Sequence, residues 1–139
     1  PIGLFVFRNS EVTGIFVIFI TSIWPTLINT AIGVQSVDSD VLKVAKSLGA
    51  SKTNTITKVI LPAVMPNILA GMRISMGTAW LVIVAAEMLL GTGIGYFIWN
   101  EWNNLYVANI FVAIIIIGIT GYVLDQIFEI LQLRFNYDS

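Results

Sequence analysis

The chain has 139 residues, of which 57% are hydrophobic and 11% are charged, and its mean hydropathy is +0.89. These values lie outside the range of soluble domains and indicate a membrane protein of about one domain. Seven basic and eight acidic residues give a formal net charge of -1, and there is no Cys and no His. The composition therefore excludes disulfides, thiolate and histidine catalysis and the usual zinc or haem sites, and it provides no field that would attract nucleic acid. We expect no catalytic residue, no metal site and no cofactor in this chain.

Three apolar segments are long enough to cross a bilayer, and they cover about residues 12–34, 60–90 and 107–131. A hydrocarbon core of about 30 Å requires about 20 helical residues at 1.5 Å each. Residues 1–7 are also apolar and resemble the end of another helix, so we expect the C-terminal part of a longer chain. The predicted fold is all-α, a polytopic transmembrane domain over residues 1–139.

The basic residues predict how these spans are oriented. Four lysines lie in the connection over residues 37–58, whereas residues 91–106 contain no Lys or Arg. Because cytoplasmic connections are enriched in basic residues, the lysine-containing connection and the tail with Arg134 are expected in the cytoplasm. Arg8 is then the one exception. Residues 91–106 are rich in Trp and Tyr and are predicted to form an outer loop at the boundary of a cell inner (plasma) membrane.

The cytoplasmic connection has the pattern of two short helices. An i, i+3, i+4, i+7 spacing places four apolar residues on one helix face: Val41, Val44, Ala45 and Leu48. Ser39 is predicted to cap the start of this helix, and Gly49 is predicted to end it. A second helix is predicted to begin after Ser51 and to lead into the next span at Pro62.

The spacing within this connection resembles a known motif. From residue 43 the chain reads K-V-A, three residues, G, nine residues and V-I-L-P. The EAA loop in the permease subunits of ABC importers reads E-A-A, three residues, G, nine residues and I-x-L-P. The matching positions are Ala45, Gly49, Leu61 and Pro62, with Val59 as a conservative match. Lys43 and Val44 replace the Glu and the first Ala of the motif.

The flanking spans extend this resemblance over about residues 5–135. Over this length the chain resembles the branch of these permeases that carries nitrate, bicarbonate, sulfonates and taurine. The cyanobacterial nitrate/nitrite and bicarbonate members are the most similar. The resemblance implies a domain like that of type I ABC importers. It also implies that the loop is a coupling helix that docks on an ATP-binding subunit through Val41, Val44, Ala45, Lys46, Leu48 and Gly49. With Lys43 in place of the Glu, a carboxylate on the partner becomes the expected contact.

The same resemblance implies the other partners. A second permease copy would complete a homodimer in the lipid membrane, and an extracytoplasmic solute-binding protein would deliver the solute. The chain has no Walker motif, since the GTGIG run and GASKT at residues 49–53 both lack the required spacing of glycine and lysine. ATP and Mg are therefore expected in the partner subunit, and this chain is expected to be a non-catalytic transport subunit.

Polar residues in the first span suggest either helix packing or a solute path. Ser22, Thr26, Asn29 and Gly33 form a narrow stripe on one face. Small and hydroxylated residues are typical of helix packing in membranes, and a series of this kind, Gly71, Ser75 and Ala79, lies in the second span. We leave both interpretations of the stripe open.

Charged residues in the spans suggest further sites. Arg73 either extends to the cytoplasmic interface or supplies positive potential to a planar anion, with Trp80 on the same helix face. Glu87 is expected to pair with a donor or to have a structural role. Asp125 and Glu129, at i and i+4 near the end of the third span, are expected to be solvated.

The predicted function is ATP-driven import of a small inorganic anion, with nitrate or nitrite as the first choice. The alternative solutes for the same mechanism are bicarbonate, in second place, and the organic sulfonates or taurine behind it. That order rests on the resemblance alone. A secondary transporter driven by an ion gradient is the alternative from another class, and it would require an ion site near the midplane. A membrane-embedded enzyme is the weaker alternative, because the residues that it would need are absent.

Overall fold

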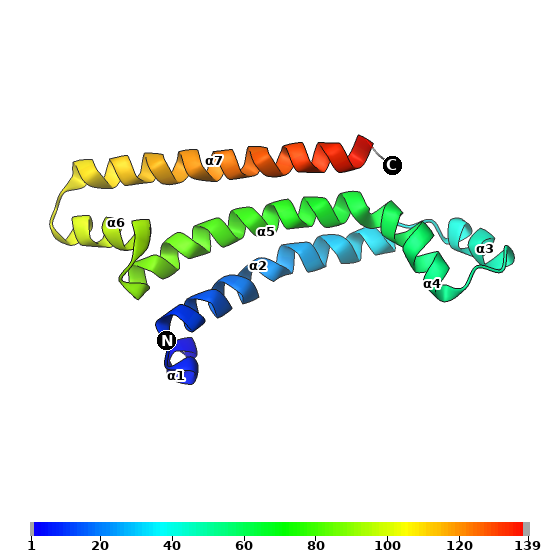
Figure 1. Ribbon diagram of the computed structural model, residues 1–139, viewed down its shortest axis with the longest axis horizontal. Helices are drawn as coiled ribbons and strands as arrows, with labels where there is room; N and C mark the ends of the chain where they lie inside the picture. Colours follow the sequence, from blue (N-terminus) through cyan, green and yellow to red (C-terminus); the bar gives the residue numbers. More distant parts are fainter. Residues whose placement is uncertain (1, 138–139) are drawn as a thin grey trace.

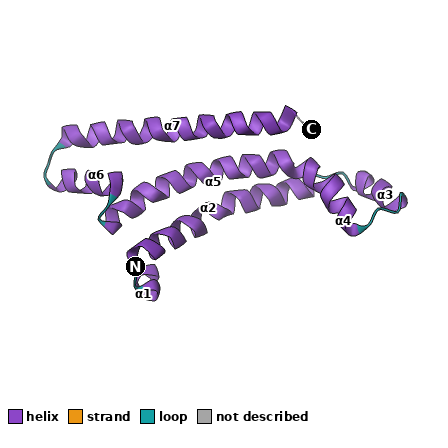
Figure 2. Cartoon of the chain, in the orientation of Figure 1, coloured by secondary structure: helices purple, strands orange, loops and turns teal. Residues whose placement is uncertain are grey.

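The computed structural model describes residues 2–137, with side chains from 5 to 133, and every regular element within this range is helical (Figure 2). The all-α prediction is therefore confirmed. The elements are α1 (Ile2–Phe7), α2 (Ser10–Gln35), α3 (Ser39–Ser47), α4 (Lys52–Thr55), η1 (Ile56–Ile60), α5 (Leu61–Leu90), α6 (Gly93–Asn103) and α7 (Val107–Tyr137). The side chain of Arg134, which contributed to the predicted orientation, lies outside the described side chains.

Three long helices form the body of the molecule (Figure 1). By length and composition, Ser10–Gln35, Lys52–Leu90 and Val107–Leu133 are each able to cross a membrane. They cover the three predicted spans. The central helix, α5, packs against α2 and α7, while α3 and α4 project beyond one end and α6 lies at the other (Figure 1).

The α2–α5 contact is close because glycines lie in it. A Cβ atom on Gly71 would be 2.9 Å from the Cα atom of Thr26 and 3.0 Å from the carbonyl oxygen of Pro25. A Cβ atom on Gly33 would be 2.7 Å from side-chain atoms of Val64, which is 1% exposed. Small residues let the two backbones approach, so dispersion contacts replace the hydrophobic driving force that lipid does not provide.

The segment over residues 91–106, predicted as an outer loop, contains the helix α6 instead. Gly91 ends α5 with a φ of 77°, in the left-handed region that favours glycine. Thr92 provides no side-chain cap for α6; the carboxylate of Glu87 accepts a hydrogen bond of 2.9 Å from the backbone N–H of Gly95. The expected donor for Glu87 is therefore present, and its negative charge lies at the positive end of α6.

Most large apolar side chains of the long helices face outward. Among the described side chains, the buried hydrophobic ones are Ala45, Val64 and Ala113. A soluble protein with such a surface would expose far more contiguous apolar area than is usual. The surface is instead suited to contact with lipid or with other transmembrane helices.

Candidate functional site

The helix α3 begins one residue earlier than predicted. Its N-cap is Asp38, whose side chain accepts a hydrogen bond of 2.8 Å from the backbone N–H of Asp40. Ser39 is the first helical residue, so its predicted role as the cap was wrong. The carboxylate of Asp38 satisfies a free N–H group and also complements the positive end of the helix dipole.

The helix ends where it was predicted to end. Gly49 has a φ of 75°, and its N–H group donates to the carbonyl of Lys46 at 3.0 Å. The N–H group of Ala50 donates to the carbonyl of Ala45 at 3.1 Å, which completes the pair of bonds that typically closes a helix at glycine. This turn directs the chain from α3 back toward α4.

The outer side of α3 presents an apolar surface. Val41, Val44 and Leu48 are 48%, 58% and 81% exposed. Ala45, the remaining residue of the predicted face, is only 8% exposed, so it packs within the chain. We call Val41, Val44 and Leu48 the α3 outer face.

The lysines of α3 do not share one environment. Lys43 forms an ion pair of 2.7 Å with Asp40, so it finds within the chain the carboxylate that was expected on a partner. Lys46 lies 200° around the helix from Val44, at 100° per residue, and lines a crevice behind α3. Lys46 therefore lies off the outer face, and its contact with an ATP-binding subunit stays a prediction.

The crevice separates α3 from the next helical segment. Ser51 caps α4 as predicted, accepting from the N–H of Asn54 at 3.3 Å. The chain then forms the π-helical turn η1, with the N–H of Leu61 donating to the carbonyl of Ile56, before α5 begins. The crevice has a volume of about 490 Å³ and is lined by Leu42, Lys46, Ala50, Lys52, Thr55, Ile56 and Ile60.

The polar stripe of α2 makes bonds within and between helices. The hydroxyl of Ser22 donates to the carbonyl of Ile18 at 2.6 Å, and the amide of Asn29 donates to the carbonyl of Pro25 at 2.8 Å. The hydroxyl of Thr26 is 2.7 Å from that of Ser75 on α5. These contacts favour the packing interpretation, and a place for Ser22, Thr26 and Asn29 in a solute path stays a prediction.

Arg73 joins α5 to α7. Its Nε and Nη2 atoms donate to the two carboxylate oxygens of Asp125 at 2.7 and 2.6 Å, and Nη2 also donates to Glu129 at 2.9 Å. The prediction that Asp125 and Glu129 are merely solvated was wrong, although all three side chains are partly exposed, at 33%, 44% and 42%. A bidentate fork fixes geometry as well as charge, so this cluster sets the α5–α7 register.

Trp80 lies at the same helix contact. Its indole N–H donates to the carbonyl of Ile117 at 3.2 Å, and a Cβ atom on Gly121 would be 3.1 Å from the indole ring. A small cavity of about 40 Å³ lies between Arg73 and Trp80 and is otherwise lined mostly by apolar residues. With two carboxylates around one guanidinium, an anion near Arg73 would meet a cluster of net negative charge.

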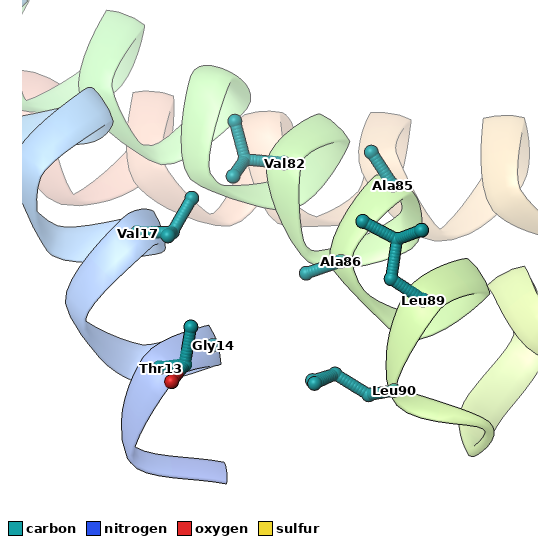
Figure 3. Close-up of a pocket in the computed structure, with 8 residues that line it drawn as sticks. All are labelled: Thr13, Gly14, Val17, Val82, Ala85, Ala86, Leu89 and Leu90. Carbon is teal, nitrogen blue, oxygen red and sulfur yellow. The ribbon is translucent and has the colours of Figure 1, made fainter. Parts of the chain in front are cut away.

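A larger pocket of about 240 Å³ separates α2 from α5 near the end that carries α6 (Figure 3). It is lined by Thr13, Gly14, Val17, Val82, Ala85, Ala86, Leu89 and Leu90. The hydroxyl of Thr13, the one polar side chain in this lining, already donates to the carbonyl of Asn9 at 2.8 Å. The pocket is therefore suited to apolar contacts rather than to an anion.

The sequence provided a weak signal for the pairing of Asp125 and Glu129 with a basic residue, which was not predicted. Asp125 and Glu129 share one face of α7 by their i, i+4 spacing, and they follow a long run without a charged residue. A charge at such a position faces a protein partner more often than lipid. The partner itself lies 52 and 56 residues earlier in the chain, so local spacing could not identify it.

Comparison with known proteins agrees with this architecture. Residues 2–137 match the family described as "Binding-protein-dependent transport system inner membrane component". The nitrate import permease protein of Leptolyngbya laminosa is 48% identical over 128 residues, which are 91% of this chain and 46% of the relative. The bicarbonate transport system permease protein of Synechococcus elongatus is 46% identical over 134 residues, 95% of this chain and 48% of the relative.

A more distant relative is the putative aliphatic sulfonates transport permease protein of Bacillus subtilis, 36% identical over 133 residues, 95% of this chain and 48% of the relative. The chain spans about half the length of the curated relatives that it matches. The match to the family covers nearly the whole chain and agrees with the three membrane-length helices. The chain therefore belongs to the family of binding-protein-dependent transport system inner membrane components.

Proposed function

We propose that this chain forms part of the permease subunit of an ATP-driven ABC importer that carries a small inorganic anion, with nitrate or nitrite as the first candidate. The observation that carries the proposal is the α3 outer face. It is a helical surface of exposed apolar side chains at the turn between two membrane-length helices. An amphipathic helix of this kind binds by laying its apolar side in a groove of a partner.

The groove would belong to an ATP-binding subunit, because this chain has no Walker motif of its own. Closure of two such subunits would move α3, and the continuous helix from Lys52 to Leu90 would carry that movement into the membrane. The solute would move because its affinity differs between inward-open and outward-open states. A second permease copy and an extracytoplasmic solute-binding protein complete the proposed assembly.

The choice of anion is supported by the relatives, which include a nitrate import permease and a bicarbonate transport permease. Bicarbonate is therefore the second candidate, and a sulfonate is the third. All three solutes are anionic, and Arg73 is neutralised by Asp125 and Glu129 in this structure. We therefore propose that the solute-binding protein, rather than this chain, mainly determines which of the three anions is transported.

Co-purification with the ATP-binding subunit of the same transport system tests the docking surface. We expect the full-length permease to retain that subunit and Leu48→Glu to lose it, because a charge would then face an apolar groove. Asn54→Glu is the matched control: it adds the same charge at an exposed position of α4 and can form a capping box with Ser51. Retention of the ATP-binding subunit by Leu48→Glu would contradict the proposal.

The energy source is tested by uptake of nitrate and of bicarbonate into cells or proteoliposomes. Uptake that continues after a protonophore collapses the ion gradient, and that stops when ATP is removed, is the expected result. The reverse dependence would establish the secondary transporter instead. Uptake of bicarbonate but not nitrate would reverse the order of the two anions while leaving the mechanism in place.

A further inference from the structure

We propose that the crevice between α3 and the α4–η1 segment is a second docking socket for the ATP-binding subunit, which inserts an apolar side chain flanked by a carboxylate. The inference rests on the proposed function and adds a contact to it. The partner would then hold α3 from two sides, with the outer face in a groove and the crevice occupied from behind.

The geometry of the crevice supports an inserted group. Its volume of about 490 Å³ falls within the range of about 300–1,000 Å³ that is typical of ligand pockets. Leu42 and Ala50 line one part and Ile56 and Ile60 another, and Ile56 is still 55% exposed. An apolar surface of this size at a proposed interface gains free energy when a partner removes it from water.

The charges at the crevice indicate which chemical groups the partner would contribute. Lys46 and Lys52 both line it, and none of the lining residues is acidic. Among the described residues 37–60, the ion pair that forms is the one between Lys43 and Asp40. The two ammonium groups at the crevice therefore remain available to a carboxylate from outside the described chain.

The hydroxyl of Thr55, the one uncharged polar side chain in the lining, already has a partner, as do those of Thr57 and Ser47 in the adjacent helices. The hydroxyls of Thr55 and Thr57 donate to the carbonyls of Ser51 and Thr53 at 3.1 and 2.9 Å. The hydroxyl of Ser47 donates to the carbonyl of Lys43 at 2.9 Å. The recognition groups that the crevice offers are thus ammonium ions and apolar side chains, which fit an acidic and apolar segment of a protein.

The ATP-binding subunit is the occupant to which the geometry points, because the crevice and the α3 outer face are two sides of the same nine-residue helix. A protein that binds the outer face already lies beside the crevice. A carboxylate placed there would attract Lys46 and Lys52 and would set the register of α3 in the groove.

The test is the affinity of full-length permease in nanodiscs for the purified ATP-binding subunit that co-purifies with it. We expect Lys46→Glu combined with Lys52→Glu to weaken binding by about tenfold or more, since like charges would then face each other. Ala50→Phe, which fills the crevice without changing charge, is expected to weaken binding as well. The single variants Lys46→Glu and Lys52→Glu are each compared with Lys58→Glu, the matched control, which makes the same change of charge at a residue that does not line the crevice.

The possible outcomes separate this inference from the proposed function. Loss of binding by Leu48→Glu together with normal binding by the double lysine variant would overturn the socket and leave the proposed function standing. Normal binding by Leu48→Glu would overturn both. An equal effect of Lys58→Glu would show general electrostatic attraction and would reject the socket. A loss of folded protein with Ala50→Phe, while the remaining folded protein binds with unchanged affinity, would show that the chain itself fills the crevice. That result would reject the socket as well.

Discussion

The side chain of Arg73 makes the most specific contact between two of the long helices. Its guanidinium bridges Asp125 and Glu129, so one basic residue compensates two acidic ones across the α5–α7 contact. Removing the guanidinium would leave two carboxylates close together without a counterion. The first effect of losing Arg73 should therefore be on helix packing, with any effect on transport as a consequence.

We predict that Arg73→Ala lowers the thermal stability of the purified full-length permease by several degrees and reduces uptake at the same time. Asp125→Asn combined with Glu129→Gln in the Arg73→Ala background should restore much of the stability, because the repelling charges are gone. Thermal unfolding in detergent measures the first effect and solute uptake the second. Unchanged stability with uptake abolished would instead assign Arg73 to the solute.

Residue types were predictable from the sequence at these positions, whereas their partners were not. The sequence marked Arg73 and Trp80 as notable because charged and indole groups are unusual within a span. Which groups they meet depends on how α7 returns beside α5. That register is set by Gly121 beneath the indole ring and by carboxylates more than 50 residues away.

Two glycines of α5 differ in the space around them: Gly71 lies in the contact with α2, whereas Gly77 borders the small cavity beside α7. A Cβ atom at Gly71 would meet backbone atoms of Thr26 and Pro25, which cannot move without moving α2. A Cβ atom at Gly77, six residues later on the same helix, would meet no atom within 4 Å. The pair provides a matched test of helix packing.

We predict that Gly71→Ala destabilises the protein by about 1–3 kcal/mol, as overpacking typically does. Gly77→Ala should be neutral or stabilising by up to about 1 kcal/mol, because alanine favours the helix. Unfolding of both variants in the same detergent, followed by circular dichroism, makes the comparison. Equal stability of the two variants would mean that α2 does not contact α5 at Gly71.

The helix boundaries show which elements the sequence could predict. The three spans and the turn at Gly49 followed from apolar length and from helix-ending glycine. The helix α6 did not, because three glycines and several aromatic residues resemble a loop, while its cap comes from Glu87 in the preceding helix. The π-helical turn η1 also escaped prediction, since its extra residue per turn leaves no mark in a short apolar pattern.

At the scale of the whole molecule, the two ends differ in charge and in side-chain type. The end with α3, α4 and η1 contains four lysines. The end with α6 contains exposed Tyr96, Trp99 and Trp102 but no Lys or Arg over residues 91–106. The long helices connect these ends (Figure 1). If the positive end lies in the cytoplasm, then α3 lies on the side where we propose an ATP-binding subunit, and α6 lies on the side where we propose a solute-binding protein.

The 139 residues contain no cysteine, so a thiol introduced among them can be followed by comparing its labelling with that of the unsubstituted protein. We predict that Asn104→Cys, just after α6, reacts with a membrane-impermeant maleimide added to intact spheroplasts. Ser47→Cys, at the exposed end of α3, should react only in inverted vesicles, because its thiol would be cytoplasmic. Labelling of Ser47→Cys in intact spheroplasts, with Asn104→Cys protected, would reverse the topology and would place α3 out of reach of any cytoplasmic ATP-binding subunit. Labelling of both after detergent treatment confirms that each thiol is accessible in the folded protein.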